Sequence, residues 1–218
     1  MIVPVFRDWP AVRALLAALA AQEGAPPHEI LLVNNDPADP APDDLPGMDT
    51  LRLLEEARPG SYAARNRGAV QARGRLLAFT DADCAPRPDW LARLARAAAG
   101  HDGLISGRVE MVSTRHPMDR LNTAEAYDWF FGINQEIYAR DGVAATANLM
   151  VPRDIWERAG GFDATLKSGG DVAFCRAAAR LGAGLRHAPE AVVRHPLRAS
   201  LGAILAKARR VAGGRAQR

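Results

Sequence analysis

The sequence is poor in cysteine, and this limits the classes of protein it can represent. Cys84 and Cys175 are the only cysteines among 218 residues. Two are too few for a disulfide-stabilised scaffold, and their separation matches no metal-binding spacing. We therefore expect both to be thiols of the hydrophobic core.

Long apolar runs are also absent. No segment approaches the roughly 18 to 20 uninterrupted apolar residues of a transmembrane helix, although hydrophobic residues make up 48% of the chain. Residues 1–6 read directly as a strand, with no basic and then apolar segment ahead of them that would direct secretion. The sequence predicts a globular, cytoplasmic protein with a substantial core.

Lysine is scarce, because 26 of the 28 basic residues are arginine. Together with the abundant alanine, this pattern indicates a coding bias, and the formal net charge of +3 is modest. We therefore expect no nucleic-acid partner. Positive charge does gather near the end of the chain, at Arg194, Arg198, Lys207, Arg209, Arg210, Arg215 and Arg218.

The last 20 residues, 199–218, form a basic segment with apolar residues at helical spacing, including Leu201, Leu205 and Val211. Such a helix either packs one face on the domain or lies on an anionic membrane surface. The first interpretation is favoured. The second adds a peripheral contact at the inner face of the membrane.

The first half of the chain alternates between strand and helix patterns. Strands are predicted at 2–6, 29–33, 51–54 and 76–80, of which 29–33 and 76–80 are expected to be buried. An amphipathic helix is predicted at 10–22 and a second helix at 61–72, with Ser61 as its N-cap. Strands separated by helices of this length favour right-handed βαβ units and a parallel sheet. The fold class is therefore α/β, and the loops at 34–36 and 81–83 emerge at the same sheet edge.

The second half is less regular. Its predicted strands are 104–112, 147–151 and 185–195, and its predicted helices are 88–99, 117–138, 152–159 and 171–181. The long helix carries Trp129, Phe130 and Phe131. Apolar aromatic residues at helical spacing favour a core position, and the alternative is that they cover the side of a site where an acceptor binds.

The most informative motif is Asp81-Ala82-Asp83, which follows the buried strand at 76–80. Carboxylates at the carboxyl end of a parallel strand face the crevice where open α/β sheets bind ligands. A hard divalent cation bridging them to phosphate oxygens relieves their mutual repulsion. Aspartate is also common in turns, so the motif alone leaves a purely structural role open.

Further polar groups stand at Asn34-Asn35-Asp36, Arg65-Asn66, Asp171 and His195. Each alone has a structural explanation, as a turn, a surface charge, an acid at a helix N-terminus or a loop histidine. Their order along the chain adds information that no single one carries.

Taken in that order, the chain resembles the family 2 glycosyltransferases, which have the GT-A nucleotide-sugar-binding fold. The resemblance spans about residues 2–196. It is carried by seven segments, at 2–6, 29–35, 60–68, 77–83, 147–153, 159–163 and 170–176.

The resemblance implies a Rossmann-like, mostly parallel central sheet flanked by helices, with a smaller acceptor-side region. Residues 1–198 then form one GT-A domain, with a nucleotide-binding part at about 1–100 and an acceptor part at about 101–198. The basic segment 199–218 follows as a helix or tail. The implied activity is metal-dependent, inverting transfer of a sugar from a UDP- or GDP-sugar to a glycan, lipid-linked or small-molecule acceptor.

The resemblance also implies roles for single residues. Asp83 is the metal ligand, Asp81 contacts the donor ribose or the metal, and His195 is a further metal ligand, with Mn²⁺ or Mg²⁺ as the ion. Asp171 is the catalytic base. The donor-binding residues are Pro4, Val5, Asn34 and Arg65 together with both acids, and Trp129 and Asn148 are assigned to the acceptor side.

Two positions depart from the commonest pattern of the family. Asn34-Asn35 stands where paired aspartates are common, and Gly170 precedes Asp171 where glutamate is common. These departures support one alternative, a non-catalytic relative that binds a nucleotide sugar. A haloacid-dehalogenase-like phosphatase is a further alternative, but its Asp-x-Asp follows the first strand, whereas here the motif follows the fourth.

Overall fold

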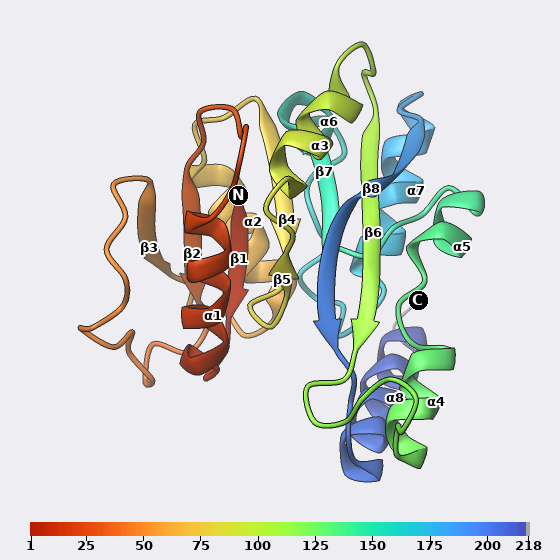
Figure 1. Cartoon of the computed structure of the whole chain (residues 1–218). Helices are drawn as coiled ribbons and strands as arrows, with labels where there is room; N and C mark the ends of the chain where they lie inside the picture. The colour runs from red at the N-terminus through yellow and green to blue at the C-terminus, as the bar shows by residue number, and fades with distance from the viewer. Residues whose placement is uncertain (217–218) are drawn as a thin grey trace.

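The computed structural model describes residues 1–216 and is built on one eight-stranded mixed sheet (Figure 1). The strands are β1 (Ile2–Val5), β2 (Ile30–Asn34), β3 (Leu51–Glu55), β4 (Leu76–Thr80), β5 (Ala85–Pro86), β6 (Leu104–Val112), β7 (Asn148–Pro152) and β8 (Leu185–Pro196). Their order is β3-β2-β1-β4-β7-β6-β8-β5.

The helices lie between and after these strands. They are α1 (Trp9–Ala20), α2 (Ser61–Gln71), α3 (Trp90–Ala98), α4 (Thr123–Phe131), α5 (Gln135–Arg140), α6 (Arg153–Arg158), α7 (Gly170–Arg180) and α8 (Leu201–Ala216). No described helix is long and apolar enough to cross a membrane.

Strand direction changes at the middle of the sheet. β3, β2, β1 and β4 pair in parallel, as the βαβ pattern predicts, whereas β7 is antiparallel to both β4 and β6. The turns after β1, β2 and β4 therefore open at one edge of the sheet, where ligands bind in such folds.

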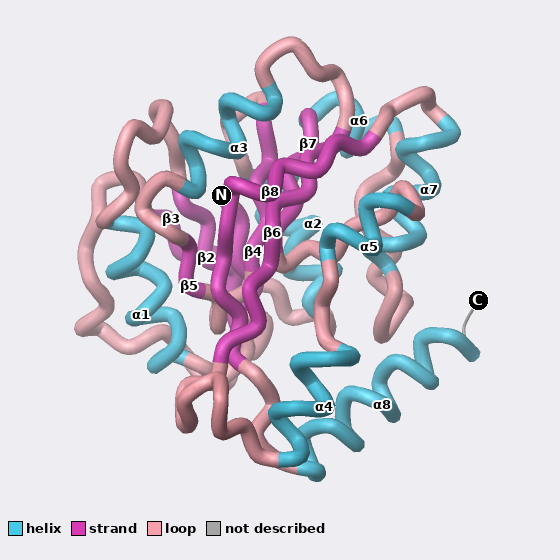
Figure 2. The backbone as a smooth tube through the Cα atoms, turned by 45° about the vertical axis from the view of Figure 1, so that its right-hand side comes forward, coloured by secondary structure: helices cyan, strands magenta, loops and turns pink. Residues whose placement is uncertain are grey.

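The sheet separates two hydrophobic layers. α1 and α3 pack with Val3, Leu32 and Ala78 on one face, and α2, α6 and α7 pack with Leu31 and Phe79 on the other. Figure 2 shows α1 and α3 apart from α7, with the strands between them. Because successive side chains of a strand point to opposite faces, nearly continuous apolar strands supply both layers.

The two cysteines are buried thiols, as expected. The α/β class is confirmed. The structure does not test the proposed division near residue 100, because one sheet runs through both parts.

Two local predictions were wrong. Gly60, not Ser61, is the N-cap of α2, and its φ of 117° is a conformation that favours glycine. The helix predicted at 117–138 is two helices. Asn122 starts α4 through a capping box, and the side chain of Asn134 starts α5 by accepting a hydrogen bond from the Ile137 amide at 3.1 Å.

The aromatic residues of α4 are not in the core, and this overturns the favoured interpretation. Trp129, Phe130 and Phe131 are 56%, 74% and 60% exposed. The buried side of α4 is occupied instead by Ala124, Glu125 and Asp128.

The basic C-terminal segment forms α8, which lies beside α4 in both ribbon views (Figures 1 and 2). Packing covers part of one side, including Ile204 and Val211, whereas Leu201 and Leu205 stay exposed. The prediction that one apolar face packs on the domain is therefore only partly met. Residues 217 and 218 of the predicted tail lie outside the described residues.

Candidate functional site

A pocket of about 520 Å³ opens at the carboxyl edge of β1, β2 and β4. It gathers side chains from the turns after these strands, from the start of α2 and from the segment after β8. Its lining is Pro4, Val5, Phe6, Asp8, Asn35, Pro59, Gly60, Ser61, Arg65, Asp81, Ala82, Asp83, His195, Arg198 and Arg210.

The acidic motif occupies a turn directly after β4. The Cys84 amide donates to the Asp81 carbonyl at 3.1 Å and closes the turn. At the end of β4, Thr80 is buried and donates to the Ala147 carbonyl at 2.9 Å. The motif is therefore both a turn and part of the pocket wall.

Asp83 faces His195 across the pocket. The His195 Nε2 lies 3.8 Å from the Asp83 Oδ2, and its Nδ1 lies 2.9 Å from the Pro196 carbonyl oxygen. A proton on Nδ1 satisfies that carbonyl and leaves the Nε2 lone pair directed at the acid side of the pocket. Burial raises the pKa of Asp83, His195 opposes that shift, and the charge of Asp81 adds to it.

Arg65 pairs with Asp81 from beneath. Its side chain is only 5% exposed and its guanidinium donates to the Asp81 carboxylate, while the same guanidinium lies 5.7 Å from the ring centre of Tyr62. The Arg65 Nε is buried without a protein partner. Arg65 therefore lines the pocket and also orients Asp81.

The tandem asparagines after β2 have different positions. Asn34 is buried, and its amide group holds its own loop, donating to the Asp39 carbonyl and accepting from the Asp36 amide. Only Asn35 lines the pocket, where its Oδ1 accepts from the Gly60 amide at 2.8 Å. The structure brings Pro4 and Val5 to the pocket, but it does not bring the side chain of Asn34 there.

Asp171 lies in the first turn of α7 and is separate from the lining of the donor-side pocket. Tyr62 connects the two places, because its hydroxyl lies 3.4 Å from the Asp171 Oδ1 and its ring stands over Arg65. Burial and the charge of Asp171 raise the pKa of Tyr62 to about 12, so Tyr62 stays a hydrogen-bond donor at neutral pH.

The glycine before Asp171 has a structural reason. A Cβ on Gly170 would lie 2.7 Å from the Tyr62 ring, closer than real Cβ contacts come. Gly169 has a φ of 77°, the left-handed conformation. A glutamate at position 170 is therefore incompatible with this placement of Tyr62.

Asn148 lies away from the lining of the donor-side pocket, and its acceptor-side role stays a prediction. Its side chain is fully buried and its amide group is fully engaged. It donates to the carbonyls of Arg108 and Ala191, and it accepts from the Trp90 Nε1 at 2.9 Å. Asn148 therefore hydrogen-bonds β7 to the place where the register between β6 and β8 shifts.

Arg198 and Arg210 are pocket residues that sequence reasoning did not assign. Both residues follow β8. The sequence placed them in the basic cluster near the end of the chain, but that cluster was interpreted as a helix or tail and not as part of a pocket. Arg198 is held by Asp128 of α4, whose oxygens lie 3.0 and 3.2 Å from its Nη1. Arg210 reaches the pocket from α8.

A divalent cation fits the acid side of the pocket. Ligand atoms of Asp81, Asp83 and Cys84 lie within 4.8 Å of one another. Burial and the two acids raise the pKa of the Cys84 thiol well above its usual range, so it stays protonated, whereas carboxylate oxygens suit Mn²⁺ or Mg²⁺. The fitting donors of this group are therefore Asp81 and Asp83, and His195, whose Nε2 lies 3.8 Å from Asp83, stays a predicted ligand.

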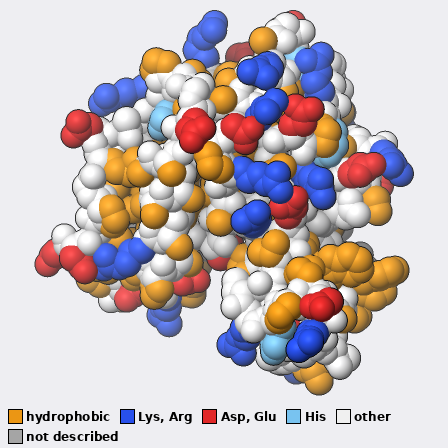
Figure 3. All heavy atoms as spheres, in the orientation of Figure 1, with side chains coloured by type: hydrophobic (Ala, Val, Ile, Leu, Met, Phe, Trp, Pro, Cys, Tyr) orange, Lys and Arg blue, Asp and Glu red, His pale blue; other side chains and the backbone are white. Residues whose placement is uncertain are grey.

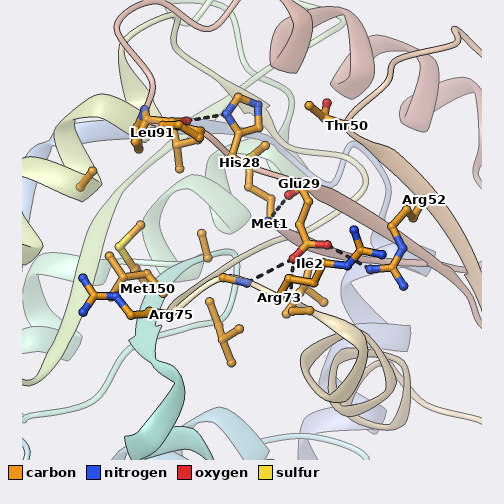
Figure 4. A pocket seen from close by; sticks show the side chains of 18 of the residues that line it. Met1, Ile2, His28, Glu29, Thr50, Arg52, Arg73, Arg75, Leu91 and Met150 are labelled. Atoms are coloured by element: carbon orange, nitrogen blue, oxygen red, sulfur yellow. Dashed lines mark hydrogen bonds and ion pairs between the residues drawn. The ribbon is translucent and has the colours of Figure 1, made fainter.

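A second cavity, of about 600 Å³, opens at the opposite edge of the sheet. Figure 4 shows Glu29 at its centre, with hydrogen bonds and ion pairs among the residues around it. The Glu29 carboxylate accepts from Arg52 at 3.0 Å and from the amides of Arg73 and Gly74. None of the residues singled out from the sequence as a site residue lines this cavity.

The chain is similar to several known proteins. Residues 1–159 match the model of glycosyl transferase family 2. Glycosyltransferase AglE of Haloferax volcanii is 34% identical over the whole chain, which covers 72% of that protein. The pre-mycofactocin glycosyltransferase of Mycobacterium tuberculosis is 28% identical over 92% of the chain, which spans 43% of that relative.

Among solved structures, the mannosyltransferase PcManGT from Pyrobaculum calidifontis, in complex with GDP-Man and Mn²⁺, superposes with a TM-score of 0.67. The match is 21% identical and covers 99% of this chain and 62% of that one. At this identity the likeness shows a shared fold.

Proposed function

The chain belongs to glycosyl transferase family 2 and is a glycosyltransferase, and from that premise we propose that it moves a sugar from a nucleoside-diphosphate donor to an acceptor hydroxyl, inverting the anomeric carbon. The observation that carries the proposal is the pocket at the carboxyl edge of β1, β2 and β4, which gathers Asp81, Asp83 and His195. The phosphatase alternative has no support here, because β1 ends at Val5 without an acid.

Donor binding is assigned to both walls of this pocket. Pro4, Val5 and Asn35 form the wall against the base, and Asn35 replaces Asn34 in that role because only Asn35 lines the pocket. The GDP-Man of the structural neighbour supports a GDP-sugar over a UDP-sugar. Arg198 and Arg210 supply two positive charges for the diphosphate from the opposite wall.

Asp83, with Asp81 and His195, would hold the divalent cation. When bound, the ion acts as a Lewis acid that stabilises the negative charge developing on the leaving diphosphate. The ion pair with Arg65 holds Asp81 in place for this task. Arg198 is itself held by Asp128, so its charge is fixed before the donor arrives.

The transfer step needs a base on the acceptor side. The acceptor oxygen forms a bond to the anomeric carbon while the bond from that carbon to the diphosphate oxygen breaks, and the diphosphate leaves with the electron pair. Attack from the opposite face inverts the configuration, and the acceptor proton passes to the Asp171 carboxylate. The Tyr62 hydroxyl, 3.4 Å from the Asp171 Oδ1, orients that carboxylate.

The test uses Asp171→Asn after a thermal-shift screen of nucleotide sugars with Mn²⁺ has identified the donor. We expect the variant to bind the donor like the wild-type chain and to lose transfer by about a hundredfold or more, the range of general-base contributions. Retained transfer would remove Asp171 from the mechanism. Retention of the donor's anomeric configuration in the wild-type product would overturn the inverting step.

The acceptor hydroxyl belongs to a glycan, a lipid-linked molecule or a small molecule. The cytoplasmic location, and contact of the basic C-terminal segment with the inner face of the membrane, also remain proposals. They are supported by the cationic residues after β8.

A further inference from the structure

Exposed hydrophobic side chains are concentrated on one small part of the molecule. We call residues 113–131 and 197–216, which contain α4 and α8, the α4–α8 lobe; it lies below the sheet at the lower right of Figure 1. Twelve large hydrophobic side chains are exposed among the described residues. Seven belong to this lobe, namely Met118, Tyr127, Trp129, Phe130, Phe131, Leu201 and Leu205.

The aromatic residues of α4 form the centre of this surface. Tyr127, Phe130 and Phe131 stand three and four positions apart, so they share one side of the helix. The rings of Tyr127 and Phe131, and those of Phe130 and Phe131, have centroids 4.8 Å apart. Figure 3 shows hydrophobic side chains gathered on the lobe, with basic side chains beside them. A contiguous apolar surface of this kind marks an interaction site.

The lobe also carries the positive charge of the chain. Its sequence contains seven basic and three acidic residues, whereas the whole chain has 28 and 25. The rest of the chain is therefore close to neutral. α8 contains no acidic residue at all.

Two of the three acids of the lobe are internal. Glu125 is buried and is bound by Ser113 and His116, and Asp128 is buried beneath Arg198 and Lys207. Only Asp119 is an exposed acid of the lobe. Because Arg198 and Lys207 are paired with Asp128 in turn, the exposed cations among the described side chains of the lobe are Arg115, Arg120, Arg209 and Arg210.

We propose that the α4–α8 lobe docks on an anionic lipid surface, with the side chains of Tyr127, Phe130 and Phe131 entering the interfacial layer. Tryptophan and tyrosine favour this layer, and cationic residues beside apolar ones bind anionic headgroups. The positive charge of the lobe favours an anionic lipid surface over a second copy of the chain, because two lobes of like charge repel each other.

Docking in this way sets the donor pocket beside the lipid surface. Arg198 and Arg210 belong to the lobe and line that pocket. An acceptor carried by a lipid then reaches the pocket from the membrane, a corollary that rests on the proposed function. The docking itself does not depend on it and is measured without donor or acceptor.

The experiment is co-sedimentation of the full chain with vesicles of phosphatidylcholine, alone or with phosphatidylglycerol. We expect binding to the anionic vesicles, and a loss of about tenfold or more in the partition coefficient for Phe130→Ser with Phe131→Ser. Val70→Ser is the matched control, because Val70 is 63% exposed on α2, away from the lobe. Its partition coefficient should equal that of the wild-type chain.

A charge variant tests whether electrostatic attraction contributes to docking on the anionic lipid surface. Arg209→Glu should weaken anionic vesicle binding at least about fivefold, the effect of losing one basic residue near the surface. Arg180→Glu, an exposed control at the end of α7, should leave it unchanged.

Tryptophan fluorescence gives a second readout of docking. Trp129 is the exposed tryptophan, whereas Trp9, Trp90 and Trp156 are buried. Trp129 lies on another side of α4 than Tyr127, Phe130 and Phe131, so the probe is Phe130→Trp in the Trp129→Phe background. Anionic vesicles should shift its emission to shorter wavelength. Failure to bind, equal binding to neutral vesicles, or a dimer that Phe130→Ser dissociates would each overturn the proposal.

Discussion

Asn148→Ala separates a structural role from a role at the acceptor site. The Asn148 amide group bonds the Trp90 Nε1 and the carbonyls of Arg108 and Ala191, at 2.9, 2.8 and 2.8 Å. All of these contacts are buried or partly buried, so the substitution leaves three polar groups without a partner. Each such group costs about 1–3 kcal/mol.

Because relaxation and water entry recover part of this cost, we expect a loss of about 4 kcal/mol in the free energy of unfolding. For a chain of this length the melting temperature then falls by about 10 °C, at roughly 2–4 °C per kcal/mol. Circular dichroism during thermal and urea unfolding measures both quantities. The matched control is Asn134→Ala, which removes only the N-cap of α5 and should cost about 1 kcal/mol.

Enzymatic activity completes this test. Below its melting temperature, Asn148→Ala should keep the transfer rate of the wild-type chain, because Asn148 has no exposed surface. A variant of wild-type stability that has lost transfer would refute the structural account and restore the role at the acceptor site.

Two further predictions concern charged side chains of α4 and α8. Burial opposes ionisation of Asp128, but bonds from Arg198 and Lys207 outweigh it and lower its pKa. Such a carboxylate stabilises the fold above its unfolded pKa of about 3.9. Asp128→Asn should therefore lower the melting temperature at pH 7, and the difference should vanish as the pH falls through the folded-state pKa. Arg210→Ala should raise the KM for the donor about tenfold, whereas Arg209→Ala should leave it unchanged.

The sequence was most informative where local pattern and packing agree. The buried strands β1, β2 and β4 are separated by α1 and by the segment that contains β3 and α2, and parallel pairing follows from that arrangement. The same argument placed Asn35, Asp81 and Asp83 at one edge of the sheet, where the pocket contains all three.

It was least informative where tertiary contacts decide. The pattern of α4 does not reveal that its core-facing side holds Glu125 and Asp128. Ser113 in the loop before the helix binds Glu125, and Arg198 from a distant segment binds Asp128. Without those partners, the apolar aromatic residues look like the buried side. Asn148 was assigned to a site for the same reason, since a buried asparagine with remote partners has no local signature.

The pocket also contains residues that no motif indicated. Arg198 and Arg210 reach it only because the chain turns back after β8, where Asp128 binds Arg198 and Lys207. A basic cluster in the sequence shows that a segment is positively charged, but it does not show which of its side chains reach the pocket. The path of α8 places Arg210 in the pocket and leaves its neighbour Arg209 outside.

The central claim is that Asp83 anchors a cation and a nucleoside diphosphate in the pocket after β4. The most direct measurement is calorimetric titration of GDP and UDP into the chain with Mn²⁺ and with EDTA, for the wild-type protein and for Asp83→Ala. We predict binding of one nucleotide that requires Mn²⁺ and is lost in the variant. Equal affinity with and without the metal, or unchanged affinity in Asp83→Ala, would contradict the account.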